Sequence, residues 1–108
     1  DDFFNIDGNF DLIIEQTFFC AIDIEKRNAY AKKVHSLLSD NGKLVGLMFN
    51  APMYSDHPPF GGSVKEYKSY FSPLFNYKYL IFPRRTQLLN LFYFSTLIFF
   101  LNPLPNKE

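Results

Sequence analysis

The sequence lacks most of the residues that mark secreted, metal-binding and nucleic-acid-binding proteins. Cys20 is the only cysteine, so no disulfide forms within the chain, and one cysteine with two histidines matches no zinc ligand set. Eleven basic and eleven acidic side chains cancel to a formal net charge of zero without gathering into a basic stretch, which argues against a nucleic-acid partner. For Cys20, a small buried side chain is favoured over a reactive thiol. We expect a chain from a reducing, cytoplasmic setting.

A hydrophobic segment long enough to cross a bilayer is also missing. Residues 88–101 form an almost continuous apolar run, but it falls short of the roughly 20 residues that a membrane-spanning helix needs. We expect one or two buried terminal strands here; a reading frame lost near Leu80 is the second interpretation and a membrane anchor the third. We therefore divide the chain into residues 1–82, half of a domain, and residues 83–108, an apolar tail of uncertain origin.

Two apolar runs in the first half predict a strand, a helix and a second strand. We place the strands at residues 11–15 and 43–49. Between them, apolar residues at helical spacing predict a helix that Asp23 caps and that residues 39–42 end. This order predicts a βαβ unit with parallel strands.

The second half continues the pattern with a loop, a helix and a strand. Residues 50–62 contain three prolines and two glycines, which indicates a loop. Ser63 is placed to cap a helix ending near Phe71, and residues 75–82 alternate weakly, as in a strand. A doubly wound α/β domain usually has more strands than 108 residues supply, so we expect a partial fold.

Polar residues follow the two predicted parallel strands. Glu15, Gln16 and Thr17 come at the end of the first strand, and Asn50 follows the second. In open α/β sheets, ligands bind beyond the carboxyl ends of the strands. The sequence therefore predicts a small-molecule site there, although a carboxylate at Glu15 that simply faces water is an equal alternative.

Several segments resemble, in their residues, order and spacing, the S-adenosylmethionine-dependent thiopurine, thiol and halide methyltransferases. The resemblance covers roughly residues 1–80 and rests on five pieces: Asp2-Phe3-Phe4, residues 10–22, Tyr30-Ala31-Lys32-Lys33, Asn41-Gly42-Lys43-Leu44 and His57-Pro58-Pro59-Phe60-Gly61-Gly62. It implies an α/β, partial Rossmann-like class I methyltransferase fold, namely the carboxyl-terminal half of the sheet with its flanking helices. The family's glycine-rich turn and the acidic residue for the ribose are absent, so we expect the carboxyl-terminal portion of a domain.

The resemblance also implies cofactor contacts. Asp2 and Phe3 match the place where the family touches the adenine of S-adenosylmethionine, and Gln16 matches a cofactor contact that is Arg in thiopurine members and Tyr in halide members. Because Gln is neither, substrate preference cannot be carried across. From composition alone, Asp2 reads as a solvated acidic end.

An aromatic wall for the methyl acceptor is predicted from Phe18, Phe19, Pro59 and Phe60. A soft, weakly hydrated nucleophile suits such a wall, and methyl transfer to it depends on positioning more than on acid or base chemistry. We accordingly assign no catalytic residue and no metal ligand. For each of the four, an ordinary core position is equally open.

These observations predict methyl transfer to a small thiol, a thiopurine-like compound or a halide, performed by a parent enzyme of which this chain is a fragment. The main alternative is a truncated remnant without activity of its own. A weaker one is another α/β enzyme, such as a nicotinamide oxidoreductase, but no Tyr-x-x-x-Lys pair follows a serine. We also expect the isolated chain to expose a strand edge and an apolar face, and so to self-associate.

Overall fold

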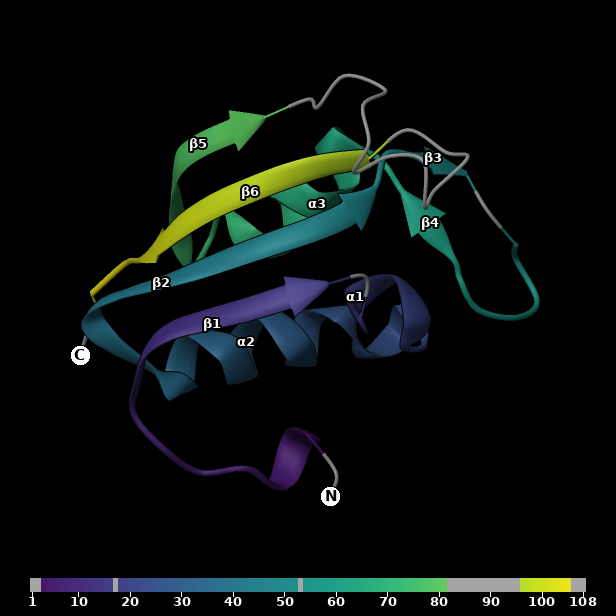
Figure 1. Cartoon of the computed structure of the whole chain (residues 1–108). Helices are drawn as coiled ribbons and strands as arrows, with labels where there is room; N and C mark the ends of the chain where they lie inside the picture. Colours follow the sequence, from purple (N-terminus) through teal and green to yellow (C-terminus); the bar gives the residue numbers. More distant parts are fainter. Residues whose placement is uncertain (1–2, 17, 53, 82–95, 106–108) are drawn as a thin grey trace.

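The chain forms a four-stranded mixed sheet with helices against one face (Figure 1). The computed structural model describes residues 3–16, 18–52, 54–81 and 96–105. The strand order in the sheet is β1-β2-β6-β5. Two short strands, β3 (Ala51–Pro52) and β4 (Gly61–Gly62), pair with each other in a second, two-stranded sheet.

The predicted βαβ unit is confirmed. β1 (Phe10–Gln16) runs parallel to β2 (Leu38–Phe49), and α2 (Arg27–Leu37) connects them after two short segments, α1 (Phe18–Ala21) and the 3₁₀ turn η2 (Ile24–Lys26). A further 3₁₀ turn, η1 (Phe3–Asn5), precedes β1. Asp23 stands at the N-cap position of η2 but makes no side-chain capping hydrogen bond.

The helix ends at Leu37, before residues 39–42, but the second strand begins earlier than the predicted residue 43, at Leu38. Leu38 pairs with Phe10 and Lys43 pairs with Leu12, so residues 39–42 bulge out opposite a single residue, Asp11. The Ser39 hydroxyl donates to Asp11 Oδ1 over 2.7 Å and ties the bulge to β1. A Cβ on Gly42 would come within 3.0 Å of the Phe10 carbonyl oxygen, so the absence of a side chain suits this tight passage.

The second predicted helix and the strand after it are confirmed. α3 (Val64–Phe71) begins after Ser63, whose hydroxyl accepts a hydrogen bond from the Glu66 amide over 3.2 Å. β5 (Phe75–Ile81) lies at the edge of the sheet opposite β1.

Part of the apolar tail forms a strand. β6 (Thr96–Pro103) lies between β2 and β5 and pairs antiparallel with both. Residues 88–95 of the apolar run lie outside the described residues, and the division of the chain at residue 83 stays a prediction. No helix in the described ranges is long and apolar enough to cross a membrane.

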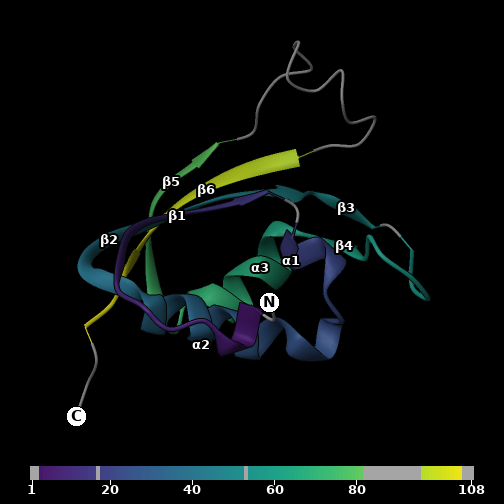
Figure 2. The same ribbon diagram turned by 60° about the horizontal axis from the view of Figure 1, so that its bottom comes forward.

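The core lies between the sheet and helices α2 and α3, which cover the same face (Figure 2). Alternate residues of β2 and β6 point into it, and Leu44, Met48 and Phe99 have no exposed surface. Burying each such side chain contributes about 1.5–3 kcal/mol, so this layer holds the helices on the sheet. The opposite face carries the alternate residues, and none of the helices in the described ranges covers it (Figure 2).

Candidate functional site

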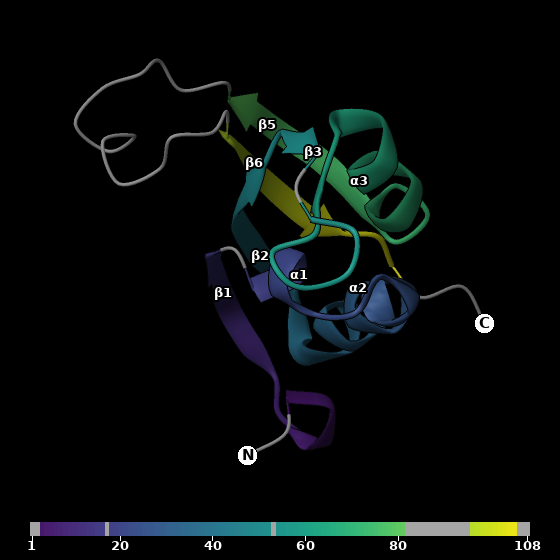
Figure 3. The same ribbon diagram turned by 90° about the vertical axis from the view of Figure 1, so that its right-hand side faces the viewer.

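The carboxyl ends of β1 and β2 meet α1 and the segment that carries β3 and β4 at one end of the molecule (Figure 3). β1 leads toward α1, and β2 leads into residues 50–62, which we call the proline-rich loop. The sequence predicted a small-molecule site at this end of the sheet, and four groups of residues define its geometry.

Glu15 holds the first turn beyond β1. Its side chain is 4% exposed, so the alternative of a carboxylate facing water is wrong, and its Oε1 accepts a hydrogen bond from the Phe19 amide. Glu15 pairs with Gly46 on β2, where an added Cβ would come within 3.3 Å of Met48 Cε. The buried carboxylate thereby fixes α1 against the end of the strand.

Cys20 and Tyr67 link α1 to the proline-rich loop and to β2. The Phe60 amide donates to the Cys20 carbonyl oxygen over 2.7 Å, and the Tyr67 hydroxyl donates to the Phe49 carbonyl oxygen over 2.5 Å. Cys20 Sγ lies 3.4 Å from the Tyr67 hydroxyl. Burial raises the pKa of the Cys20 thiol, in keeping with the favoured interpretation of a small buried side chain.

Arg27 contacts both the proline-rich loop and α3, and its role was not predicted from the sequence. Its guanidinium donates to Glu66 Oε2 over 2.5 Å and to the Gly61 carbonyl oxygen over 2.7 Å, and it lies 4.7 Å from the centre of the Phe19 ring. The side chain is fully buried. One signal was available, because Arg27 begins the stripe at i, i+3, i+4 and i+7 that continues through Tyr30, Ala31 and Val34, all of them buried.

An aromatic hollow of about 430 Å³ opens beside α1. Phe3 stacks on Tyr30 with their ring centres 5.1 Å apart, and Phe18 lies 5.6 Å from Phe3. Phe18 is 40% exposed and Phe3 is half-buried, so both offer ring surface to the hollow. Asp23 and Lys26 add charged groups to its lining. The structure thus brings together two of the predicted contacts, while Asp2 lies outside the described residues.

The other predicted site residues are distributed over three environments. Gln16 is exposed and lines a hollow of about 230 Å³ on the face of the sheet away from the helices. Phe19 is fully buried in the core, so its place in an acceptor wall has no support from its surroundings. Pro59 and Phe60 are half-buried, and the Pro59 carbonyl oxygen accepts from the Tyr54 amide over 3.1 Å.

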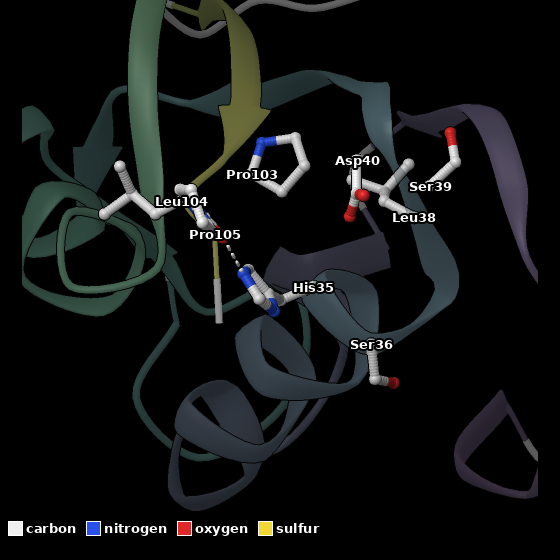
Figure 4. A pocket seen from close by; sticks show the side chains of 8 residues that line it. All are labelled: His35, Ser36, Leu38, Ser39, Asp40, Pro103, Leu104 and Pro105. Atoms are coloured by element: carbon white, nitrogen blue, oxygen red, sulfur yellow. Dashed lines mark hydrogen bonds between the residues drawn. The ribbon is translucent and has the colours of Figure 1, made fainter. Parts of the chain in front are cut away.

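A hollow of about 440 Å³ lies at the opposite end of β2, away from this site (Figure 4). His35 reaches across from the end of α2, and its Nε2 is 2.7 Å from the Leu104 carbonyl oxygen. This contact ties the segment after β6 to the helix. In the described residues, no three side chains of metal-ligating type come together anywhere.

Comparison with known proteins agrees on one class of enzyme. Residues 2–87 match the family described as thiopurine S-methyltransferase (TPMT). The chain is 42% identical over 65 residues to a probable thiol methyltransferase 2 of Arabidopsis thaliana, which covers 60% of this chain and 29% of that protein. It is 37% identical over 76 residues to thiocyanate methyltransferase 1 of Brassica oleracea, covering 68% of this chain and 34% of that protein. The chain thus spans about a third of the length of these curated relatives.

Solved structures show the same fold. An N-methyltransferase NodS from Bradyrhizobium japonicum, in complex with S-adenosyl-L-homocysteine, superposes with a TM-score of 0.72 at 11% identity, over 97% of this chain and 53% of that one. A TehB-like SAM-dependent methyltransferase from Corynebacterium glutamicum gives 0.70 at 12% identity, over 96% and 54%. The mixed α/β sheet therefore matches class I methyltransferases over about half their length. With most of its sequence matching the family, the chain belongs to the thiopurine S-methyltransferase family of S-adenosylmethionine-dependent methyltransferases.

Proposed function

We propose that this chain is the carboxyl-terminal part of an enzyme that transfers a methyl group from S-adenosylmethionine to a small thiol, a thiopurine-like compound or a halide. The observation that carries the proposal is the junction of α1 with the proline-rich loop, where Phe60 is hydrogen-bonded to Cys20. This hydrogen bond connects α1, which follows Gln16 at the end of β1, to the loop segment that contains Pro59. The names of the Arabidopsis and Brassica relatives favour a sulfur acceptor.

The aromatic hollow fits the flat adenine part of the cofactor. Phe3, which stacks on Tyr30, presents a half-buried ring on the hollow's wall, and a flat heteroaromatic ring packs well against such a surface. We assign Phe3 and Gln16 to cofactor contacts, and extend the assignment to Asp2 from the family resemblance alone. Phe18, Pro59 and Phe60 then form the acceptor wall, with Phe19 as the core residue that supports it.

Positioning and exclusion of water account for the part that this chain plays. When bound, S-adenosylmethionine would supply an electrophilic methyl carbon, which a thiolate or halide would attack in line while the carbon–sulfur bond breaks and S-adenosylhomocysteine leaves. The aromatic wall keeps water from the acceptor, whose nucleophilicity rises as its hydration is lost. Glu15 and Arg27 hold α1 and the loop in place through Phe19 and Gly61. No group on the chain needs to accept a proton if the acceptor arrives as an anion.

A chimaera tests the proposal. In the Arabidopsis thaliana relative, the 65 matched residues are replaced by the corresponding residues of this chain. Calorimetry with S-adenosylhomocysteine and methyl transfer to thiocyanate, iodide and a small thiol are then measured. We expect binding and transfer to at least one acceptor. A cooperatively folded chimaera without either would favour the alternative, a remnant that keeps the fold without the activity.

Gln16→Ala in the same chimaera tests the cofactor contact. We expect cofactor affinity to fall by about 0.5–1.5 kcal/mol, the usual net contribution of one neutral hydrogen bond, with little change in melting temperature because the side chain is exposed. Unchanged affinity with a clear drop in melting temperature would remove Gln16 from the site.

A further inference from the structure

One side chain of α3 contacts both ends of the proline-rich loop. Tyr67 is fully buried, and its hydroxyl donates to the carbonyl oxygen of Phe49, the last residue of β2 before the loop. At the later end, a Cβ added to Gly62 would lie 2.6 Å from Cζ of the Tyr67 ring, so the backbone there is in direct contact with the ring. Ala51 pairs with Gly62 between β3 and β4. The loop therefore begins and ends against the same side chain.

The Tyr67 hydroxyl also reaches α1. Cys20 Sγ lies 3.4 Å from it, and because the single hydroxyl proton is donated to Phe49, the thiol is the donor in this contact. The Cys20 carbonyl oxygen in turn accepts from the Phe60 amide over 2.7 Å. One phenol group thus connects the end of β2 with α1 and, through Cys20, with the loop residue Phe60.

The Tyr67 ring has little freedom to move. It lies edge-on to two fully buried rings, with 5.7 Å between its centre and that of Phe19 and 5.6 Å between its centre and that of Phe99. Arg27 is a third neighbour, with its guanidinium carbon 5.9 Å from the ring centre. Protein interiors are close-packed, so the ring stays where the core holds it and the loop fits against the ring.

Gly62 is the position at which this fit can be changed. Its φ lies outside the left-handed region, so alanine suits the backbone, and what the absence of a side chain permits is the contact with Tyr67. A methyl group at this position would push the loop away from the ring. The distance between the loop and α3 is therefore set by this glycine and this tyrosine.

We propose that Tyr67 is a positioning residue for methyl transfer and that, together with Gly62, it determines the size of the acceptor. It acts through Pro59 and Phe60, the two loop residues of the acceptor wall, because their position follows from where the loop is held. A displacement of about 1 Å near a reacting group can lower a rate about a hundredfold. The effect of Tyr67 on the acceptor rests on the proposed function, but its hold on the loop does not.

Hydrogen exchange in the 108-residue chain measures the hold on the loop without cofactor or activity. Tyr67→Phe removes the hydroxyl and keeps the ring. We expect the hydrogen-bonded amides of Tyr54 and Phe60 to exchange about three- to tenfold faster relative to those of the β2–β6 ladder, which corresponds to one lost hydrogen bond. Tyr70→Phe removes a hydroxyl three residues later on α3, at a half-buried position, and should leave this ratio unchanged.

Kinetics in a chimaera measure the effect on the acceptor. Residues 2–87 replace the matching part of the Brassica oleracea relative, and thiocyanate is compared with the larger thiophenol as acceptor. We expect Tyr67→Phe to raise KM for the acceptor about three- to tenfold at unchanged affinity for S-adenosylhomocysteine. Gly62→Ala should raise activity on thiophenol relative to thiocyanate, because the loop then stands further out. A merely structural role would lower kcat alone, through a smaller folded fraction.

Three results would overturn the proposal. One is an equal effect of Tyr67→Phe and Tyr70→Phe on exchange in the loop. Another is an active chimaera in which Tyr67→Phe leaves KM unchanged and Gly62→Ala leaves the ratio of the two acceptors unchanged. Should Tyr67→Phe fail to fold, Gly62→Ala takes its place in the exchange measurement, and an unchanged loop is the third.

A folded chimaera without any activity has a different meaning. It would contradict the proposed function and, with it, the effect on acceptor size. The exchange measurement would still decide whether Tyr67 holds the loop.

Discussion

Arg27 is the residue on which the arrangement of the site depends most directly. Its buried guanidinium reaches Glu66 on α3 and Gly61 in the loop, while its own backbone begins α2. The Nε atom has no hydrogen-bond partner in the described part of the chain. A buried charge of this kind is tolerable only while its few partners remain, so the loop and both helices are held in one geometry.

Glu66→Gln removes the charge that compensates Arg27. We expect the free energy of unfolding to fall by about 1–3 kcal/mol, because the guanidinium stays buried while its anionic partner becomes neutral. Urea unfolding followed by circular dichroism measures the change. Glu25→Gln, the same substitution at an exposed position in η2, serves as the control. Equal effects of the two substitutions would show that the Arg27 contact contributes nothing specific.

At the scale of elements, sequence and structure agree where a local signal exists. The strands, the parallel βαβ order and the start of α3 at Ser63 followed from apolar runs and a capping residue. The early start of β2 did not, because the bulge at residues 39–42 is held by a contact between Ser39 and Asp11 that is distant in sequence. The helical turn at α1 was also missed. It depends on the Glu15 carboxylate accepting a hydrogen bond from the Phe19 amide, whereas the sequence indicated only that Glu15 ends a strand.

The candidate site divides in the same way. Its location at the carboxyl ends of the strands was predictable from topology, whereas the separate environments of Phe18 and Phe19 were not. Adjacent residues on a helical turn point in directions about 100° apart, so one ring meets the hollow and the other the core. Periodicity over four residues is too short to reveal which is which.

Ser63→Ala tests the element that follows the loop. Losing the hydroxyl that accepts from the Glu66 amide should lower the free energy of unfolding by about 0.5–2 kcal/mol. Asp23→Ala is a suitable comparison, because Asp23 occupies the N-cap position of η2 without a side-chain capping bond, and its effect should be smaller. Chemical denaturation of both variants decides. A larger loss for Asp23→Ala would mean that Ser63 is a weak cap, in keeping with its long hydrogen bond of 3.2 Å.

For the molecule as a whole, one-sided burial concentrates the aromatic residues between sheet and helices. The centre of the Phe19 ring lies within 6 Å of the ring centres of four other aromatic residues: Tyr30, Tyr67, Tyr70 and Phe71. Two of these tyrosines, Tyr30 and Tyr67, are almost completely buried. Their hydroxyl groups make the stability of the core sensitive to alkaline pH.

Burial raises the pKa of both Tyr30 and Tyr67 well above the ordinary value, with the charge of Glu15 adding to the effect at Tyr30. The folded chain therefore keeps both protons at a pH where the unfolded chain loses them. Their contribution to stability is fully present below about pH 10 and falls as pH rises further, by about 1.4 kcal/mol per pH unit for each tyrosine. Urea unfolding between pH 9 and about pH 11 should show this decline in the native sequence. Tyr30→Phe should reduce the slope by the share of one tyrosine, and an unchanged slope would mean that Tyr30 ionises equally in the folded and unfolded chain.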